Sequence, residues 1–549
     1  MYVYDEYDQK MVDERVAQYR DQTNRFLAGE LPPEEFQHLR LRNGLYIQRL
    51  APMLRIAVPY GLLSSRQLRK LAYITRRFDR GYAHLTTRQN VQLNWPILEE
   101  VPDILEELAS VEMHAIQSSG NCIRNVTSDQ YAGVAQDEIE DSRPWAEIIR
   151  QWSTFHPEFN WLPRKFKIAV TSATQDRAAV QVHDIGVRIL NNNGATRFEI
   201  LAGGGLGRTP VIAPVIRHNL EPKHLLTYLE AILRVYNRYG RRDNKYKARI
   251  KILVRAMTPE VFAEKVDAEW QTLKDGIGTL TDAEISRVKG HFTFPPYETL
   301  DGHIPEIDDR IADNSGFSNW LKQNVKPHKQ AGYAIVNLAL KQTGIPPGDI
   351  TDKQLETVAD LADEFSFGEA RVTHEQNLTL ADVPKKSLFS LWQALVNAKL
   401  ATPNLGLLTD IICCPGGDYC SLANAKSIPV AEAIQRQFDD LDYLHVLGEL
   451  DLNISGCMNA CGHHHVGNIG ILGVDKKGEE FYQVSIGGSG FEDASLAKIL
   501  GPSFARDEIP SVIQKLVNVH LHKREGTERF LDTYRRIGID PYKQAVYTS

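Results

Sequence analysis

The chain has 549 residues, of which 42% are hydrophobic and 24% are charged, and it carries a formal net charge of −7. This composition is typical of a globular enzyme with roughly three or four domains, and the mild negative charge argues against a general nucleic-acid-binding protein. The sequence opens with charged residues rather than an apolar core, and no run of about 18 apolar residues occurs. We therefore expect no secretory signal, no membrane span and a cytoplasmic location.

Three elements are predicted in succession in the first part of the chain. The stretch SSRQLRKLAYITRRF (64–78) has apolar residues at helical spacing, and Ser65 is placed to cap the start of this helix. Residues 82–95, YAHLTTRQNVQLNW, alternate between apolar and polar as a strand does. The next stretch, VPDILEELAS (101–110), is helical again, so the chain is predicted to be a mixed α/β protein.

Four basic residues in the first half form a candidate anion site. Lys165 and Lys167 lie two residues apart in a predicted strand, so their side chains are expected to project on the same side. Arg88 lies in LTTRQN and Arg124 lies in GNCIRNV. Each of these cations taken alone is explained equally well as a solvated surface charge. Together, they suggest a binding site for a small anion.

The second part of the chain repeats the first. Residues 345–380 align with residues 58–93 without a gap at an offset of 287, with twelve identities. Residues 467–490 resemble residues 183–205 more weakly, and both read as strand, turn, strand and glycine-rich loop. We therefore predict two related halves that pack about a pseudo-twofold axis and share a central cleft: about residues 45–240 and 330–525. One informative difference between the halves is that Glu375 stands where the first copy has Arg88.

Five of the six cysteines lie in two short windows, IICCPGGDYC (411–420) and SGCMNACGHHH (455–465). So few cysteines exclude a disulfide scaffold, and such clustering in a reducing compartment is typical of metal-binding or catalytic cysteines. The spacing Cys414-x5-Cys420 and Cys457-x3-Cys461 supplies four thiolates, enough for an iron–sulfur cluster or a tetrahedral zinc ion. Cys413 adjoins Cys414 and cannot easily point into the same small site, so we interpret it as a packing residue.

Two alternatives to an iron–sulfur cluster use the same residues. Three histidines, His463, His464 and His465, follow the last cysteine and keep open a zinc-binding, non-enzymatic protein. The x5 spacing argues against zinc, because zinc knuckles usually have shorter loops. A single catalytic cysteine would leave the other clustered cysteines unexplained.

The cysteine spacing, taken with LTTRQN, CIRNV and LPRKFK in the first half, resembles the sulfite and nitrite reductase hemoprotein family. The resemblance covers about residues 40–540, including the repeat. Members of this family hold a siroheme coupled to a [4Fe–4S] cluster. The resemblance implies that the cluster is bound by Cys414, Cys420, Cys457 and Cys461. Cys461 is implied to be the bridging thiolate as well, the proximal ligand of the siroheme iron.

The resemblance implies roles for further residues. The basic residues that hold the substrate anion are matched by Arg88, Arg124, Lys165 and Lys167. Arg249 and Lys251, in the basic run 241–255, are candidates for binding the siroheme carboxylates, with a solvated basic helix as the alternative. Asn459 is expected to touch the macrocycle. Two features depart from the family pattern: GHHH follows the last cysteine, and Ser119 stands where some relatives carry a cysteine crosslinked to a tyrosine.

The implied fold is α/β (α+β) with a two-fold internal repeat. A ferredoxin-like central domain built from both halves is expected between two mixed α/β lobes, around a central siroheme cleft. The predicted segments are an N-terminal arm (1–40), the ferredoxin-like half-domain of the first repeat (41–110), a substrate-side α/β lobe and linker (111–325), the ferredoxin-like half-domain of the second repeat (326–400), an iron–sulfur and siroheme lobe (401–525) and a C-terminal tail (526–549).

The implied activity is the assimilatory six-electron reduction of sulfite to sulfide, a step of sulfate assimilation toward cysteine. Nitrite reduction to ammonia with the same cofactors is the alternative, and sulfite is preferred because the accessory domains of the larger NADH-type nitrite reductases are absent. The glycine-rich stretch 203–210 lacks the context of a dinucleotide site, so electrons are expected from a separate ferredoxin or an NADPH-oxidising flavoprotein subunit. The cation-rich stretch 522–543 is either a docking site for an acidic donor or a solvated helix face.

Overall fold

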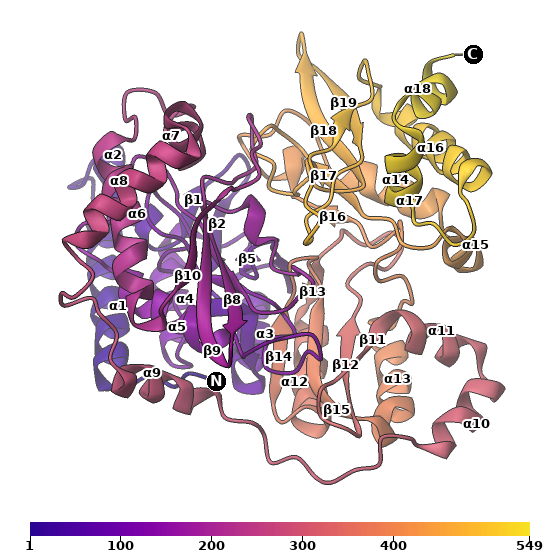
Figure 1. Ribbon diagram of the computed structural model, residues 1–549, viewed down its shortest axis with the longest axis horizontal. Coiled ribbons are helices and arrows are strands. Elements are labelled where there is room, and N and C mark those ends of the chain that lie inside the picture. The colour runs from indigo at the N-terminus through magenta and orange to yellow at the C-terminus, as the bar shows by residue number, and fades with distance from the viewer. Residues whose placement is uncertain (549) are drawn as a thin grey trace.

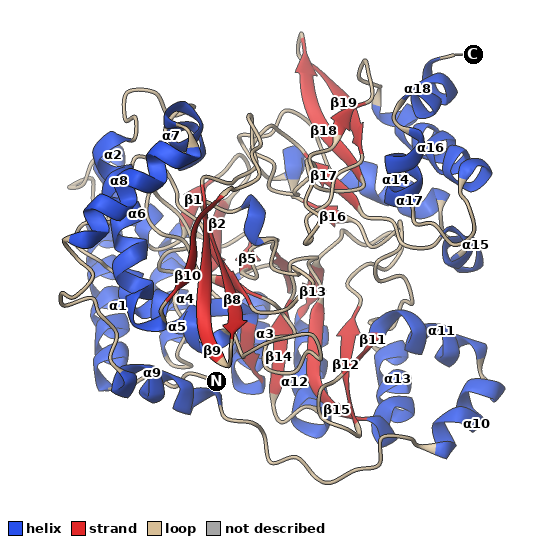
Figure 2. Ribbon diagram, in the orientation of Figure 1, coloured by secondary structure: helices blue, strands red, loops and turns tan. Residues whose placement is uncertain are grey.

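The structure of the protein, a computed structural model, describes residues 1–548. These residues form 18 α-helices and four five-stranded sheets, which confirms the predicted mixed α/β class. Three large hydrophobic cores lie under these sheets. In Figure 2 the helices lie mostly on the outside and the strands toward the middle of the molecule. Among the described residues, no helix is both long and apolar enough to cross a bilayer.

Two central sheets each take one strand from the other half of the chain. Their strands are β1 (Leu45–Ile47), β2 (Pro52–Ile56), β3 (Leu62–Ser64), β4 (Tyr82–Leu85), β5 (Val91–Leu93), β11 (Val325–Pro327), β12 (Tyr333–Leu338), β13 (Asp349–Thr351), β14 (Glu369–Val372) and β15 (Leu378–Pro384). One sheet has the order β1-β2-β5-β4-β13 and the other has the order β11-β12-β15-β14-β3. Because β13 pairs with β4 and β3 pairs with β14, the two repeats interlock rather than fold side by side.

The repeat is also visible in the helices that pack on these sheets. Helices α3 (Ser65–Phe78) and α12 (Asp352–Phe365) pack against each other, and Arg69 and Arg76 of α3 form ion pairs with carboxylates of α12. Both helices begin with a capping box, at Ser64 and at Thr351. The expectation that Ser65 caps α3 was therefore one residue off, since the Ser64 hydroxyl accepts the Gln67 N–H.

The segment 82–95, expected as one strand, is a hairpin. Strands β4 and β5 pair antiparallel, and the chain reverses over Thr86–Asn90. The Thr86 N–H donates to the Asn90 carbonyl at 2.9 Å, and Gln89 takes a positive φ of 56°. The second half has the same turn, with a 2.9 Å bond from Thr373 to Asn377. The expectation of a single strand is wrong at TTRQN, because a tight turn and a strand both place polar residues between apolar ones.

Two outer sheets share one topology. The first lobe contains β6 (Thr127–Ser128), β7 (Ile168–Thr171), β8 (Ile185–Asn192), β9 (Ala195–Ala202) and β10 (Val215–Leu220), and the second contains β16 (Ile412–Cys413), β17 (Leu452–Ser455), β18 (Ile469–Lys476), β19 (Glu479–Ile486) and β20 (Lys498–Ile499). In each lobe the first three strands are parallel, and a long antiparallel hairpin follows. The weaker part of the sequence repeat is thus a real structural repeat.

The remaining helices surround these sheets. They are α1 (Glu6–Leu27), α2 (Pro33–Arg42), α4 (Val101–Ala109), α5 (Arg143–Ser153), α6 (Leu225–Tyr239), α7 (Ile250–Met257), α8 (Pro259–Gln271), α9 (Asp282–Lys289), α10 (Pro305–Asp313), α11 (Ser315–Asn324), α13 (Leu388–Asn397), α14 (Ile428–Gln437), α15 (Leu441–Leu447), α16 (Ile509–Lys523), α17 (Phe530–Ile537) and α18 (Asp540–Tyr547). Helix α1 packs on α4, so the N-terminal residues join the central core. The connection from α9 to α10 runs along the bottom edge of the molecule in Figure 1.

Candidate active site at the junction of the two halves

The clustered thiols lie at the carboxyl ends of two parallel strands. Cys414 directly follows β16, and Cys457 and Cys461 lie in the loop that follows β17. Because β16 and β17 are parallel neighbours, their following loops meet at one edge of the sheet. All six cysteines are free thiols. The sheet topology therefore places the loops that carry the proposed ligands at one edge.

The loops that carry the thiols are packed closely enough for backbone groups to reach sulfur. The Gly456 N–H donates to the Cys414 Sγ at 3.2 Å, and the Asn459 amide donates to the Cys457 Sγ at 3.5 Å. A Cβ placed on Gly456 would lie 2.7 Å from the Cα of Gly416, so a side chain there would separate the two loops. Such N–H···S donors and glycine-rich approaches suit an iron–sulfur cluster.

Without a positive partner, the thiolate forms of these cysteines are disfavoured. Burial raises the pKa of Cys414 to about 12, and burial likewise raises the pKa values of Cys420 and Cys457. A negative charge on Cys461 contributes to all three raised pKa values. A bound metal centre reverses this penalty, because coordination deprotonates a thiol outright. The residues present thus fit a metal cluster.

Cys413 is separate from this group. Its side chain is only 1% exposed and belongs to the hydrophobic core of the second lobe. Its backbone N–H and carbonyl are both bound by the Gln376 side chain. These contacts are those of a packing residue.

The anion-site cations approach the thiols from the first half. Arg88 lies on the β4–β5 turn and donates to the Asn125 carbonyl at 2.6 Å and to the Thr127 hydroxyl at 2.9 Å. Arg124 donates to the carbonyls of Ser118 and Gly120 at 2.9 and 2.7 Å. These neutral acceptors orient both guanidinium groups without cancelling their charge.

Lys165 and Lys167 flank Phe166 in an extended segment. The expected strand begins only at Ile168, since the Lys167 N–H is bound by the Asp184 carboxylate at 2.8 Å rather than by a neighbouring strand. Burial lowers the pKa of Lys165 to about 8, while a charge on Cys461 acts in the opposite direction. Burial also lowers the pKa of Lys167 well below its ordinary value, and Lys165 and Arg88 add to this effect. The lysines therefore lie near Cys461 and near one another.

The four cations share one further property. Within residues 1–548, none of Arg88, Arg124, Lys165 and Lys167 forms an ion pair with a carboxylate. Burial lowers the pKa of Arg88 to about 9 as well; Asp184 opposes this effect, and Arg124 and Arg249 add to it. A half-buried group of like charges without counterions is an arrangement that an anion stabilises.

Arg249 and Lys251 have protein partners. Arg249, the residue before α7, forms an ion pair with the buried Asp184 at 2.7 Å. Lys251 is 4% exposed and donates to the Leu206 carbonyl at 2.7 Å, and burial lowers its pKa to about 7. Both side chains thus support the glycine-rich loop 203–207, which lies against the backbone of Asn459. They lie beside the cysteine loop, and a role toward the siroheme carboxylates stays a prediction.

The three histidines do not face solvent. His463 and His464 are buried, and the His465 Nε2 lies 2.9 Å from the Gly207 carbonyl oxygen. Burial lowers the pKa values of His464 and His465 to about 3 and 4, so both rings are neutral near pH 7. Both ring nitrogens of His464 lack a hydrogen-bond partner. Part of this run therefore connects the cysteine loop to loop 203–207, across the junction of the halves.

One residue near this site gave no signal in the sequence. Tyr46, on β1, lies beside Ser119, Arg124 and Lys165, and its pKa is lowered because the positive charges of Arg124, Arg55 and Lys165 outweigh the effect of burial. It lies outside the aligned repeat and in no motif. Ser119 brings a hydroxyl to this position, so no thioether crosslink to a tyrosine can form there.

Grouped thiols facing unpaired cations define, as a class, a cluster-bearing enzyme for small anions. The chain belongs to the nitrite and sulphite reductase family. Its 4Fe-4S domain matches residues 119–274 and 407–549, and the ferredoxin-like half domain matches residues 48–111 and 337–398. The chain is therefore an oxidoreductase of nitrite or sulfite, and the expected cofactors, siroheme and a [4Fe–4S] cluster, are those of this family.

Individual relatives span nearly the whole chain. A ferredoxin–nitrite reductase of Synechococcus elongatus is 28% identical over 91% of this chain and 93% of its own length. A sulfite reductase [ferredoxin] of Mycolicibacterium paratuberculosis is 26% identical over 87% of this chain and 81% of its own. The solved Mycobacterium tuberculosis NirA protein has the same fold, with a TM-score of 0.76, 24% identity and coverage of 94% and 92%. The zinc alternative finds no support among these relatives.

Proposed function

We propose that the chain catalyses the six-electron reduction of sulfite to sulfide at the junction of its two halves. The observation that carries this choice is the set of four cations without carboxylate partners. Sulfite, a dianion with three oxygens, offers these cations more negative charge and more hydrogen-bond acceptors than nitrite does. It is therefore expected to be stabilised more by charge-assisted hydrogen bonds. The domain limits given above are part of the same proposal.

The proposed ligands of the cluster are Cys414, Cys420, Cys457 and Cys461. Cys461 is the exposed member of the four, and its charge has the largest charge effect on the pKa of Lys165. Both observations support its assignment as the thiolate shared with the siroheme iron. When bound, the siroheme and the cluster supply the electrons and the site where the anion is reduced. Asn459, Arg249 and Lys251 border the cysteine loop and are proposed to hold the macrocycle.

The chain's own residues bind the anion and supply protons. Arg88 and Arg124 are held by carbonyl and hydroxyl acceptors, so they present fixed donors to an oxyanion and lower the cost of bringing it to an electron-rich centre. Lys165, with its pKa near 8, can give a proton from Nζ at neutral pH and recover it from water. The Tyr46 phenol beside it is a second proton donor.

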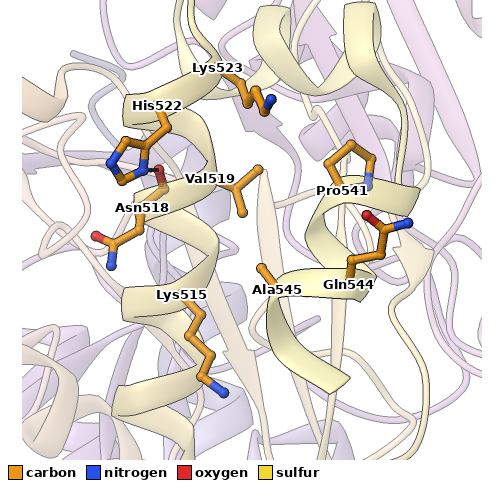
Figure 3. Close-up of a pocket in the computed structure, with 8 residues that line it drawn as sticks. All are labelled: Lys515, Asn518, Val519, His522, Lys523, Pro541, Gln544 and Ala545. Carbon is orange, nitrogen blue, oxygen red and sulfur yellow. Dashed lines mark hydrogen bonds between the residues drawn. The ribbon is translucent and has the colours of Figure 1, made fainter. Parts of the chain in front are cut away.

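Ferredoxin is the proposed electron donor, because several relatives are named for it. The C-terminal tail is a weak docking surface, since Arg529, Arg535 and Arg536 are already in ion pairs with nearby carboxylates. On the neighbouring helix α16, Lys515 and Lys523 form no ion pair within residues 1–548, and they line a hollow of about 440 Å³ between α16 and α18 (Figure 3). An NADPH-oxidising flavoprotein subunit is the second candidate donor.

Nitrite is the second candidate substrate, because most of the relatives found are nitrite reductases. Steady-state kinetics with reduced methyl viologen on both anions test the choice. We expect a higher kcat/KM for sulfite, and Lys167→Gln should lower it more for sulfite than for nitrite. A higher kcat/KM for nitrite, with equal losses in the variant, would assign nitrite instead.

A further inference from the structure

A cavity lies at the junction of the halves, and none of the proposed cluster ligands or anion-site cations lines it. Its volume is about 570 Å³, and its walls come from the segment after β6 in the first half and from the β14–β15 turn and the segment before β17 in the second. Carboxylates dominate the lining: Asp137, Glu375, Asp410, Glu449, Asp451, Glu492 and Asp493 face only Arg177, Lys326 and Arg529.

This cavity is the repeat counterpart of the anion site. The aligned turns place Glu375 at the position of Arg88. In the lobes, the Lys167 N–H donates to the Asp184 side chain at 2.8 Å, and the Asp451 N–H donates in the same way to the Asn468 side chain at 3.1 Å. The following strands pair identically, with Ile168 opposite Ile185 and Leu452 opposite Ile469.

The charges are inverted at these matched positions. Since β7 and β17 are equivalent, Lys167 corresponds to Asp451, and Lys165, two residues earlier, corresponds to Glu449. Three cations of the anion site thus have acidic counterparts, and Glu375, Glu449 and Asp451 all line this cavity. Three inversions at structurally matched positions, all facing one cavity, indicate a site of opposite charge preference.

The carboxylates of this cavity are only partly compensated by the protein, because Asp137, Glu449 and Asp493 are paired with arginines. Within residues 1–548 neither Glu375 nor Asp451 forms an ion pair, and Asp410 lies 3.9 Å from Lys341. Burial raises the pKa values of Glu375 and Asp451 to about 7, and Asp410 raises both further. The basic side chain of Arg177 is already paired with Asp129 and Asp137.

A neutral side chain adds an unused acceptor. Gln130 lines the cavity and is 4% exposed, and its Nε2 lies 3.4 Å from Glu375. Its carbonyl oxygen Oε1 is buried without a hydrogen-bond partner. A buried acceptor left unpaired is destabilising, so the cavity favours a ligand that donates hydrogen bonds as well as one that is positive.

We propose that this acidic cavity binds an organic di- or polyamine, whose ammonium groups contact Glu375 and Asp451 and donate to Gln130. An amine fits better than a single metal ion, because no three of the described carboxylates that line this cavity are placed to hold one ion. A cavity of this volume also has room for an extended aliphatic ligand rather than a single ion. The amine site is independent of which anion the enzyme reduces.

Titration calorimetry of the cofactor-loaded protein with spermidine tests this proposal. We expect binding of one spermidine per chain, with Kd raised at least tenfold by Glu375→Gln and by Asp451→Asn. Glu479→Gln, an equal loss of charge at an exposed strand position of the same lobe, should leave Kd unchanged. Methyl viologen-linked activity should be normal in all three variants, because these residues lie outside the cofactor site.

Several outcomes overturn the proposal. They are the absence of spermidine binding to the natural protein, equal Kd values in all variants, and binding of Mg²⁺ alone with displacement of spermidine. If the buried substitutions prevent folding, Glu449→Gln provides the second test, since that side chain is exposed at the rim. Spermidine should raise the unfolding temperature of the natural protein more than that of Glu449→Gln.

Discussion

The hydroxyl of Thr87 donates a hydrogen bond to the carbonyl oxygen of Cys461 at 2.9 Å, and this bond joins the two halves at the proposed site. Thr87 directly precedes Arg88 on the β4–β5 turn, and its own carbonyl oxygen lies 3.2 Å from the His374 Nδ1 of the second half. The turn that presents an anion-binding cation is therefore fixed to the loop that carries the proposed bridging thiolate.

Replacing Thr87 tests this connection. Thr87→Val keeps the shape and removes the hydroxyl, so kcat/KM should fall roughly fivefold for the loss of about 1 kcal/mol. Thr87→Ser keeps the donor and should retain most of the activity. Steady-state kinetics and the visible spectrum of both variants provide the measurement. Equal activity of the valine and serine variants would show that the bond has no role in positioning.

Arg88 is predicted to bind the anion and not the cofactors. Arg88→Gln should raise KM roughly tenfold or more, since a charge-assisted hydrogen bond contributes about 1.5–3 kcal/mol, while iron content stays normal. Glu375→Gln, at the matched turn of the other half, is the control and should keep the natural KM. If Arg88→Gln bound sulfite normally, the anion-site assignment would be wrong.

Cys461 is predicted to be required for the cofactors. Cys461→Ser should lose siroheme or activity, because serine does not replace a thiolate as a soft ligand. Cys413→Ala, a change at the neighbouring buried cysteine of the other window, should retain iron, acid-labile sulfide and most activity. Metal analysis and the visible spectrum of both purified variants decide. Full cofactor content in Cys461→Ser would contradict the ligand assignment.

The acidic cavity predicts a pH-dependent stability. Because the folded-state pKa values of Glu375 and Asp451 are raised to about 7, folded protein binds more protons than unfolded protein between roughly pH 4.5 and 7. Their contribution to stability is therefore present at low pH and is lost as pH rises through about 7. In amine-free buffer, Glu375→Gln should match the natural protein at pH 5 and unfold at a higher temperature at pH 8. A constant difference across this range would rule out the buried charge as its cause.

Most of the proposed site could be inferred from the sequence because its parts are local. Cys414 and Cys461 lie in short spaced motifs, and the turn residue Arg88 stands out where the ungapped repeat changes sign. The interlocking of the halves through β3 and β13 was accessible only as an expectation from the repeat and the family. Tyr46 could not be predicted, because it reaches the site through strand pairing and not through a motif.

The acidic cavity also could not be predicted from sequence motifs alone. Only Glu375 lies in the ungapped repeat, whereas the match of Asp451 to Lys167 depends on equivalent strands and hydrogen bonds that a single sequence does not display. The burial of the histidine run 463–465 could not be predicted from the sequence either, because a run of polar residues is normally expected to be exposed. Its burial follows from the contact of the cysteine loop with residues 203–207, which are far away along the chain.

The central claim is that the junction of the halves reduces sulfite, and one measurement tests it most directly. The cofactor-loaded protein is supplied with sulfite and a measured amount of reduced methyl viologen, and the sulfide formed is quantified. One sulfide for every six electrons consumed, with a kcat/KM above that for nitrite, is the predicted result. Electron consumption without sulfide, or a preference for nitrite with ammonium as the product, would contradict it.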